Sequence, residues 1–127
     1  MNISFFCYLF LPLVIACKKH STVPALNLPE PEAAIIDNSY PLVTAASSIS
    51  LDTGTVYRIG LVQYASFFKF DRSVENGDLY YEAIQASSKQ FIPLKFFILS
   101  NGTGKIVAVT SPSKAEVEKF NKAWQRN

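Results

Sequence analysis

The chain has few side chains of the kinds that carry out catalysis or bind metals. Its one histidine, His20, and its two cysteines, Cys7 and Cys17, all lie in the first 20 of 127 residues. The remaining chain has no His or Cys, so its carboxylates are the acids that could act in chemistry. The acidic residues considered for this role are Asp52, Asp71, Glu75, Asp78 and Glu82. The last four surround one polar segment without the spacing of an EF-hand calcium loop, so we expect a solvated loop with neither metal nor cofactor.

Three short motifs resemble catalytic signatures. Asp52-Thr53-Gly54 resembles the Asp-Thr-Gly loop of aspartic proteases, where two such loops bring two carboxylates together and a homodimer would supply the second loop. Ser66-Phe67-Phe68-Lys69 has the Ser-x-x-Lys spacing of serine β-lactamases, but within a strand this spacing sends the two side chains to opposite faces. Gly102-Thr103-Gly104-Lys105 resembles part of a phosphate-binding loop, although a strand follows it where a helix is needed. We expect turns and strands with no catalytic residue, and keep a dimeric aspartic protease using Asp52 as a third hypothesis.

The hydrophobic pattern predicts one α+β domain over residues 46–127. About four strands are expected in a small antiparallel sheet, in the order strand, strand, helix, strand, strand, helix, with both helices packed on one face. The expected elements are a strand around Ile49 and Leu51, strand structure in residues 56–70, a helix that ends before Pro93, a hairpin formed by residues 94–99 and 106–110, and a final helix capped by Ser113 and Glu116.

Composition favours a folded domain that does not bind nucleic acid. The chain is 49% hydrophobic and 17% charged, which excludes disorder throughout. The net charge is only +2 and no basic run is longer than Lys18-Lys19, so the sequence has no basic patch of the kind that binds nucleic acid. Most of the 10 Phe and 6 Tyr residues must form the core. If Phe68, Tyr81 and Phe97 face water together, they would form a binding surface for a protein or a ligand.

The N-terminus has the pattern of a targeting signal. Residues 5–16 form an apolar run that is too short to span a bilayer as a helix and is typical of a signal peptide. The run ends in Val14-Ile15-Ala16-Cys17, which resembles the lipobox of bacterial lipoproteins. The resemblance implies that residues 1–16 are removed and that Cys17 receives lipid, including palmitate-type acyl chains, as a membrane anchor. The alternatives are an ordinary secretory signal cut after Ala16 and a cytosolic chain with an apolar N-terminus.

The same resemblance favours the outer membrane over the inner membrane, because residue 18 is not Asp. Residues 17–45 are then expected to be the lipidated cysteine and a tether, since four prolines interrupt regular structure there. These prolines are Pro24, Pro29, Pro31 and Pro41. Parts of this segment, such as Ile35-Ile36 and Leu42-Val43, could also dock on the domain or begin a strand.

The leading hypothesis is a lipid-anchored, non-enzymatic protein of the cell envelope that binds another envelope protein, as an inhibitor, immunity factor or assembly accessory. The hairpin of residues 95–109 resembles the strand-turn-strand segment of PepSY-type propeptide domains. The alternative is a lipoprotein that binds a small hydrophobic ligand in a pocket between helix and sheet.

Lipid attachment at Cys17 predicts the intact mass of the protein. A membrane form that begins at Cys17 and is heavier by acyl groups is expected, and Cys17→Ala should abolish it, because only a thiol there can take the lipid. Mass spectrometry of the membrane and soluble fractions measures both. An unmodified full-length mass in the soluble fraction would contradict this attachment.

Overall fold

The computed structural model describes residues 27–125, so the expected signal peptide and Cys17 lie outside the described residues. Within this range the elements are α1 (Ala33–Asp37), β1 (Ser39–Thr44), β2 (Ala46–Thr53), β3 (Val56–Leu61), β4 (Phe68–Asp71), α2 (Gly77–Gln90), β5 (Leu94–Leu99), β6 (Lys105–Thr110) and α3 (Lys114–Gln125). The strands form one sheet in the order β1-β5-β6-β4-β3-β2. Neighbouring strands are antiparallel except β4 and β6, which are parallel.

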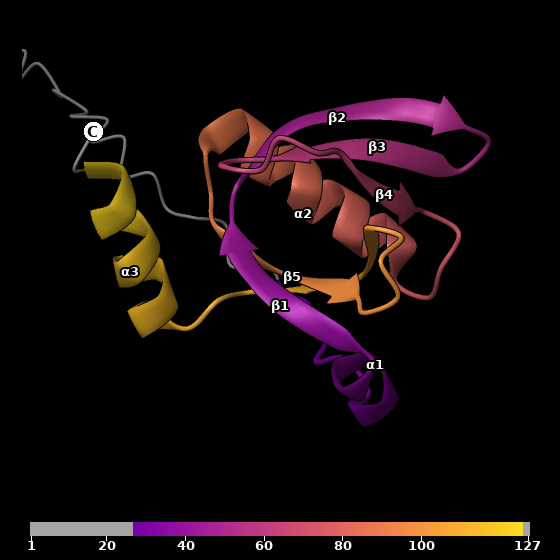
Figure 1. Ribbon diagram of the computed structural model, residues 1–127, viewed down its shortest axis with the longest axis horizontal. Helices are drawn as coiled ribbons and strands as arrows, with labels where there is room; N and C mark the ends of the chain where they lie inside the picture. Colours follow the sequence, from indigo (N-terminus) through magenta and orange to yellow (C-terminus); the bar gives the residue numbers. More distant parts are fainter. Residues whose placement is uncertain (1–26, 126–127) are drawn as a thin grey trace, which may run out of the picture.

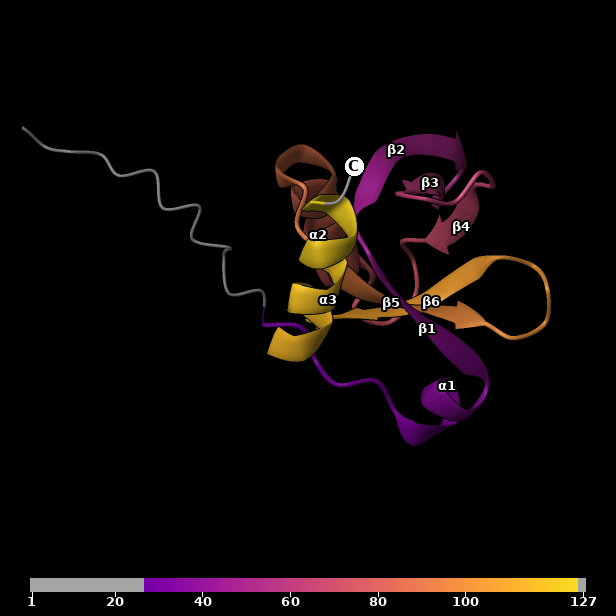
Figure 2. The same ribbon diagram turned by 60° about the vertical axis from the view of Figure 1, so that its left-hand side comes forward.

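The structure corrects the expected architecture. The fold is α+β, but the expectation of about four antiparallel strands with two helices is wrong, because residues 27–125 form a six-stranded mixed sheet and three helices. One additional strand arises because residues 56–70 divide into β3 and β4, with Gln63 in the turn between them at a φ of 75°. The helices also do not share a face, since α2 lies within the curve of the sheet and α3 lies outside it beside β1 (Figures 1 and 2).

The other additional strand, β1, lies in the segment expected to be a tether. Pro41 is tolerated there because β1 is an edge strand. The Ser100 N–H donates to the Asn38 carbonyl at 2.9 Å, and antiparallel bonding alternates, so the backbone of Pro41 faces away from β5, where no N–H is needed. The chain joins the domain even earlier, because Leu28 and Ile35 pack against the core.

A sharp bend connects the two edges of the sheet. Only Ala45 separates β1 from β2, although these strands lie at opposite ends of the strand order. The sheet must therefore curl until its ends nearly meet. The Val62 N–H donates to the Ala45 carbonyl at 2.9 Å, and Thr44 Oγ1 donates to the Val62 carbonyl at 3.0 Å. These bonds join the bend to the end of β3.

Helix α2 lies inside the curl (Figure 1). Four of its residues recur at helical spacing on one buried stripe: Tyr80, Ala83, Ile84 and Ser87. They belong to a core that includes Ile59, Leu61, Phe70, Phe96, Ile98, Ile106 and Val109 from the strands. Apolar side chains therefore fill the space between α2 and the sheet.

Ser87 connects α2 to the bend. Its side chain is fully buried, and its hydroxyl accepts the Ala46 N–H at 2.9 Å and donates to the Ile92 carbonyl at 2.6 Å. Ala46 is almost completely buried, and its small side chain permits this close approach. One hydroxyl thus joins the start of β2, the last turn of α2 and the segment that leads to β5.

Helix α3 begins at the expected capping box. The Glu116 N–H donates to Ser113 Oγ at 3.2 Å, and Glu116 Oε1 accepts the Ser113 N–H at 3.1 Å. The other end of α3 is held by aromatic contacts, because the Phe91 ring centre lies 5.6 Å from that of Phe120 and 5.5 Å from that of Trp124. Phe91 ends α2 at a φ of 56°.

Ser87→Ala should lower the free energy of unfolding by about 2–4 kcal/mol, because it leaves a buried N–H and a buried carbonyl without partners. Urea denaturation measures the change. Ser88→Ala, at the next and only half-buried position, is the matched control and should stay within about 0.5 kcal/mol of the wild type. Equal losses in both variants would contradict the role of the hydroxyl.

Candidate interaction surface

The carboxylates selected from the sequence do not converge on one site. Asp52 pairs with Arg58 at 3.6 Å and Asp78 with Arg72 at 2.7 Å, while Glu75 is exposed on the loop before α2. Glu82 is exposed on α2 itself. In the described part of the chain, no three His, Cys, Asp or Glu side chains lie close enough together to hold a metal ion.

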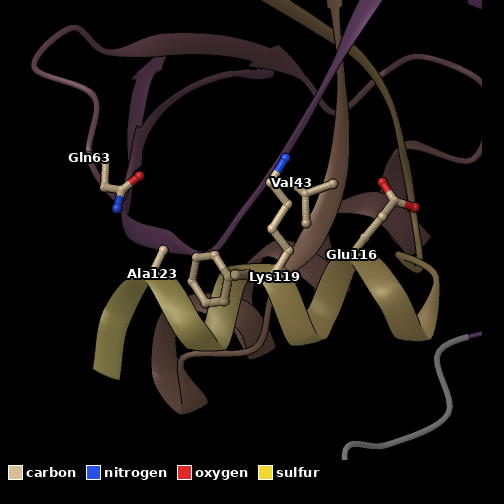
Figure 3. A pocket seen from close by; sticks show the side chains of 6 residues that line it. Val43, Gln63, Glu116, Lys119 and Ala123 are labelled. Atoms are coloured by element: carbon tan, nitrogen blue, oxygen red, sulfur yellow. The ribbon is translucent and has the colours of Figure 1, made fainter. Parts of the chain in front are cut away.

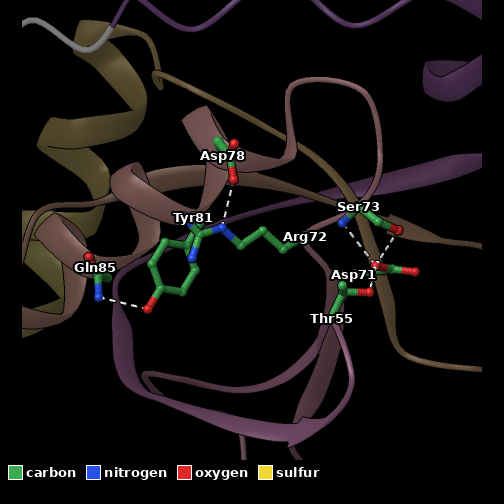
Figure 4. A network of polar contacts seen from close by, with 7 residues as sticks. All are labelled: Thr55, Asp71, Arg72, Ser73, Asp78, Tyr81 and Gln85. Carbon is green, nitrogen blue, oxygen red and sulfur yellow. Dashed lines mark hydrogen bonds and ion pairs between the residues drawn. The ribbon is translucent and has the colours of Figure 1, made fainter.

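Asp71, the last residue of β4, joins the turn between β2 and β3 to the loop that leads to α2 (Figure 4). Its Oδ1 accepts from the Ser73 hydroxyl at 2.7 Å, from the Thr55 hydroxyl at 2.7 Å and from the Ser73 N–H at 2.9 Å. These bonds, the Ser73 hydroxyl first, lower the pKa of the Asp71 carboxyl to about 2. The carboxylate therefore joins two loops, because its donors come from Ser73 in the loop after β4 and from Thr55 in the turn between β2 and β3.

A second network fastens the start of α2 to the sheet (Figure 4). Arg72 Nε donates to Asp78 at 2.7 Å, and the Arg72 guanidinium lies 3.9 Å from the ring centre of Tyr81. Gln85 Nε2 donates to the Tyr81 hydroxyl at 2.8 Å, and the Tyr57 ring lies 4.9 Å away. Tyr81 therefore contacts three side chains, those of Arg72, Gln85 and Tyr57, and is only half-buried.

The expected binding surface of Phe68, Tyr81 and Phe97 does not form. Phe68 is 8% exposed and Phe97 is 6% exposed, so both belong to the core, and only Tyr81 reaches the surface in part. Strand alternation explains the burial of Phe68, because Phe68 and Phe70 of β4 point inward while Lys69 between them is exposed. These three aromatic residues thus share no exposed patch.

Other apolar side chains are exposed instead. Leu51 on β2 is 61% exposed, and Phe67, just before β4, is 60% exposed. Tyr64, in the turn between β3 and β4, is also exposed. The Arg58 guanidinium lies 5.5 Å from the Phe67 ring centre. Sequence reasoning missed Phe67 because residues 66–68 read as continuous strand, where the alternation that places Phe67 outside depends on the register of β4.

A hollow of about 360 Å³ lies between α3 and β1 (Figure 3). It is lined by Val43, Gln63, Glu116, Lys119, Phe120 and Ala123. The alternative function, binding of a small hydrophobic ligand, requires a pocket between helix and sheet whose lining is mainly apolar. This hollow has the required position. Here Glu116 and Lys119 bring charge to the hollow, so nothing in its chemistry favours that alternative, which stays a prediction.

The bonds to Asp71 predict acid sensitivity. The folded carboxyl has a lower pKa than the ordinary 3.8, so it stabilises the fold above about pH 4, and this stability is lost as the pH falls towards about 2. Ser73→Ala should raise the pKa of Asp71 towards 3.8 and weaken this acid dependence, as NMR titration and urea midpoints across the same pH range would measure. An unchanged pKa in the variant would contradict the assignment.

Comparison with known proteins shows that this chain resembles solved structures in its fold. No family model matches the chain, and no curated protein matches it. The crystal structure of pro-protein-glutaminase is similar with a TM-score of 0.57 and 16% identity, over 67% of this chain and 30% of that one. A mutant of the same proprotein gives 0.55 and 17%, over 65% and 28%. The chain spans less than a third of these structures, and identities this low show the fold alone. No helix in residues 27–125 is long and apolar enough to cross a membrane.

Proposed function

We propose that the chain is a non-enzymatic protein-binding module of the bacterial cell envelope, anchored in the outer membrane by lipid on Cys17. The observation that carries the binding role is the exposure of Leu51 and Phe67, each about 60%, on the half-sheet formed by β2, β3 and β4. Burying such a side chain in an interface stabilises a complex by roughly 1.5–3 kcal/mol.

The local chemistry supports a binding role over a catalytic one. Asp71 accepts three bonds from Thr55 and Ser73, and Asp52 and Asp78 each face an arginine, so these acids have structural partners. The similar solved structures are of a proprotein of protein-glutaminase, of which this chain spans about 30%. That likeness concerns a domain-sized part of the proprotein and brings no activity to this chain.

The anchor is supported by the residues that precede the domain. The apolar run of residues 5–16 ends in Val14-Ile15-Ala16-Cys17, as in a lipoprotein signal. Because Leu28 already packs against the core, only the ten residues 18–27 lie between the lipidated cysteine and the domain. At about 3.5 Å per extended residue, they reach at most about 35 Å. A partner would therefore meet the domain close to the membrane.

Site-specific crosslinking in the cell tests this function. A photoreactive p-benzoylphenylalanine in place of Phe67 keeps an exposed aromatic ring and should give one discrete protein adduct, seen as a shifted band and identified by mass spectrometry. The same group in place of Lys122, exposed on α3, is the matched control and should give little adduct. Absence of any protein adduct at either position, or equal diffuse labelling at both, would refute the binding role.

A further inference from the structure

The two edges of the sheet are protected very differently. The β1 edge carries Pro41 and has α3 beside it. The β2 edge is eight residues long, contains no proline, and has Asp52 as its only charged residue. All of its residues from Ser50 to the end of the strand are exposed. Natural proteins usually protect an edge of this kind with proline, charge, β-bulges or a covering element, because its unpaired backbone groups can accept another strand. Register shifts occur in the pairing of β2 with β3 between Ala46 and Ser48 and between Leu51 and Thr53, so the regular stretch open to an added strand runs from Ser48 to Leu51.

Hydrogen-bond alternation identifies the open groups on this edge. The Arg72 N–H donates to the Thr55 carbonyl, so alternate residues from Thr55 onward direct their backbone groups at β4. The Val62 N–H donates to the Ala45 carbonyl, so Val62 and every second residue before it in β3 direct their backbone groups at β2. Ser48 and Ser50 therefore direct their backbone groups at β3. The N–H and carbonyl groups of Ile49 and Leu51 point away from the sheet, towards an added strand.

The side chains beside the edge define what such a strand would carry. Leu51 lies opposite Tyr57, on the face that carries α2, where an apolar side chain of the added strand would contact it. On the other face, the register places Ser50, Arg58 and Lys69 in one row across three strands. Arg58 is half-exposed and pairs with Asp52 at 3.6 Å, whereas Lys69 has no ion pair with another described residue. The row therefore keeps a net positive charge from Lys69, and a carboxylate at its end would be attracted to it.

We propose that the β2 edge binds an extended segment of a partner protein as a seventh strand, with an apolar side chain beside Leu51 and a carboxylate facing the Arg58–Lys69 row. This inference rests on the proposed function and names its surface and the kind of partner. Charge favours a different protein over a second copy, because a second β2 edge would bring a row of the same net positive charge towards the first. Pairing at a sheet edge supplies affinity through the backbone and selectivity through alternate side chains.

A defined peptide tests the edge in the purified domain. The probe is acetyl-Ser-Val-Glu-Val-Ser-Val-Ser-amide at up to about 1 mM, the range of weak specific binding. Binding should slow hydrogen exchange of the Ile49 and Leu51 amides by at least about tenfold, the equivalent of about 1.4 kcal/mol. N-methylation of one alternating set of peptide residues should abolish this protection, and methylation of the other set should not, because only one set faces the edge.

Charge exchange supplies the matched control. Replacing the peptide Glu by Lys should weaken binding about tenfold, and Lys69→Glu in the domain should restore it, since both changes act on one row. Failure of the peptide to bind, or binding without protection of the two amides, would overturn the edge inference. Protection without peptide, together with a doubled mass in solution, would also overturn it by assigning the edge to a second copy. Crosslinking through Phe67 would be unaffected by any of these failures, so the two proposals fail separately.

Discussion

The fold depends on the bend at Ala45, where the chain leaves one edge of the sheet and begins the other. The peptide groups at this bend are buried and need partners, which Val62 and Ser87 supply. Ser87 is the more demanding of the two, because its hydroxyl both accepts the Ala46 N–H and donates to the Ile92 carbonyl. An apolar residue there would leave two buried groups unpaired. The Ser87 side chain therefore couples three features of the fold: the curvature of the sheet, the position of α2 and the path of the chain from α2 to β5.

The same bend makes the two halves of the sheet unequal. The half with β1, β5 and β6 is covered by α3, whose Glu116 also pairs with Lys95 at 3.5 Å. The half with β2, β3 and β4 carries Leu51 and Phe67 at its surface. Only the parallel pairing of β4 with β6 joins the halves within the sheet. Exposed apolar surface and open backbone groups thus occur on the same half, which is the physical basis for assigning recognition to it.

Polar side chains in this domain mostly build turns and helix ends. Asp71 joins the β2–β3 turn to the loop after β4, the Arg72–Asp78 pair holds the start of α2 beside Tyr81, and Glu116 caps α3. A carboxylate that accepts several local hydrogen bonds is held ionised, as the lowered pKa of Asp71 shows. Such a group is suited to fixing loop geometry.

Local signals in the sequence were sufficient for elements whose determinants lie within a few residues. The hairpin of β5 and β6 needs only apolar strands and a glycine-rich turn, and α3 needs only its capping box, so both were predicted. The strand count depended on tertiary structure, because Pro41 is permitted only at an edge and Gln63 takes a positive φ only where the chain must reverse between β3 and β4. Exposure of Phe67 and burial of Phe68 likewise depend on which face meets α2, and that is set by long-range pairing and the bend at Ala45, which local sequence patterns do not encode.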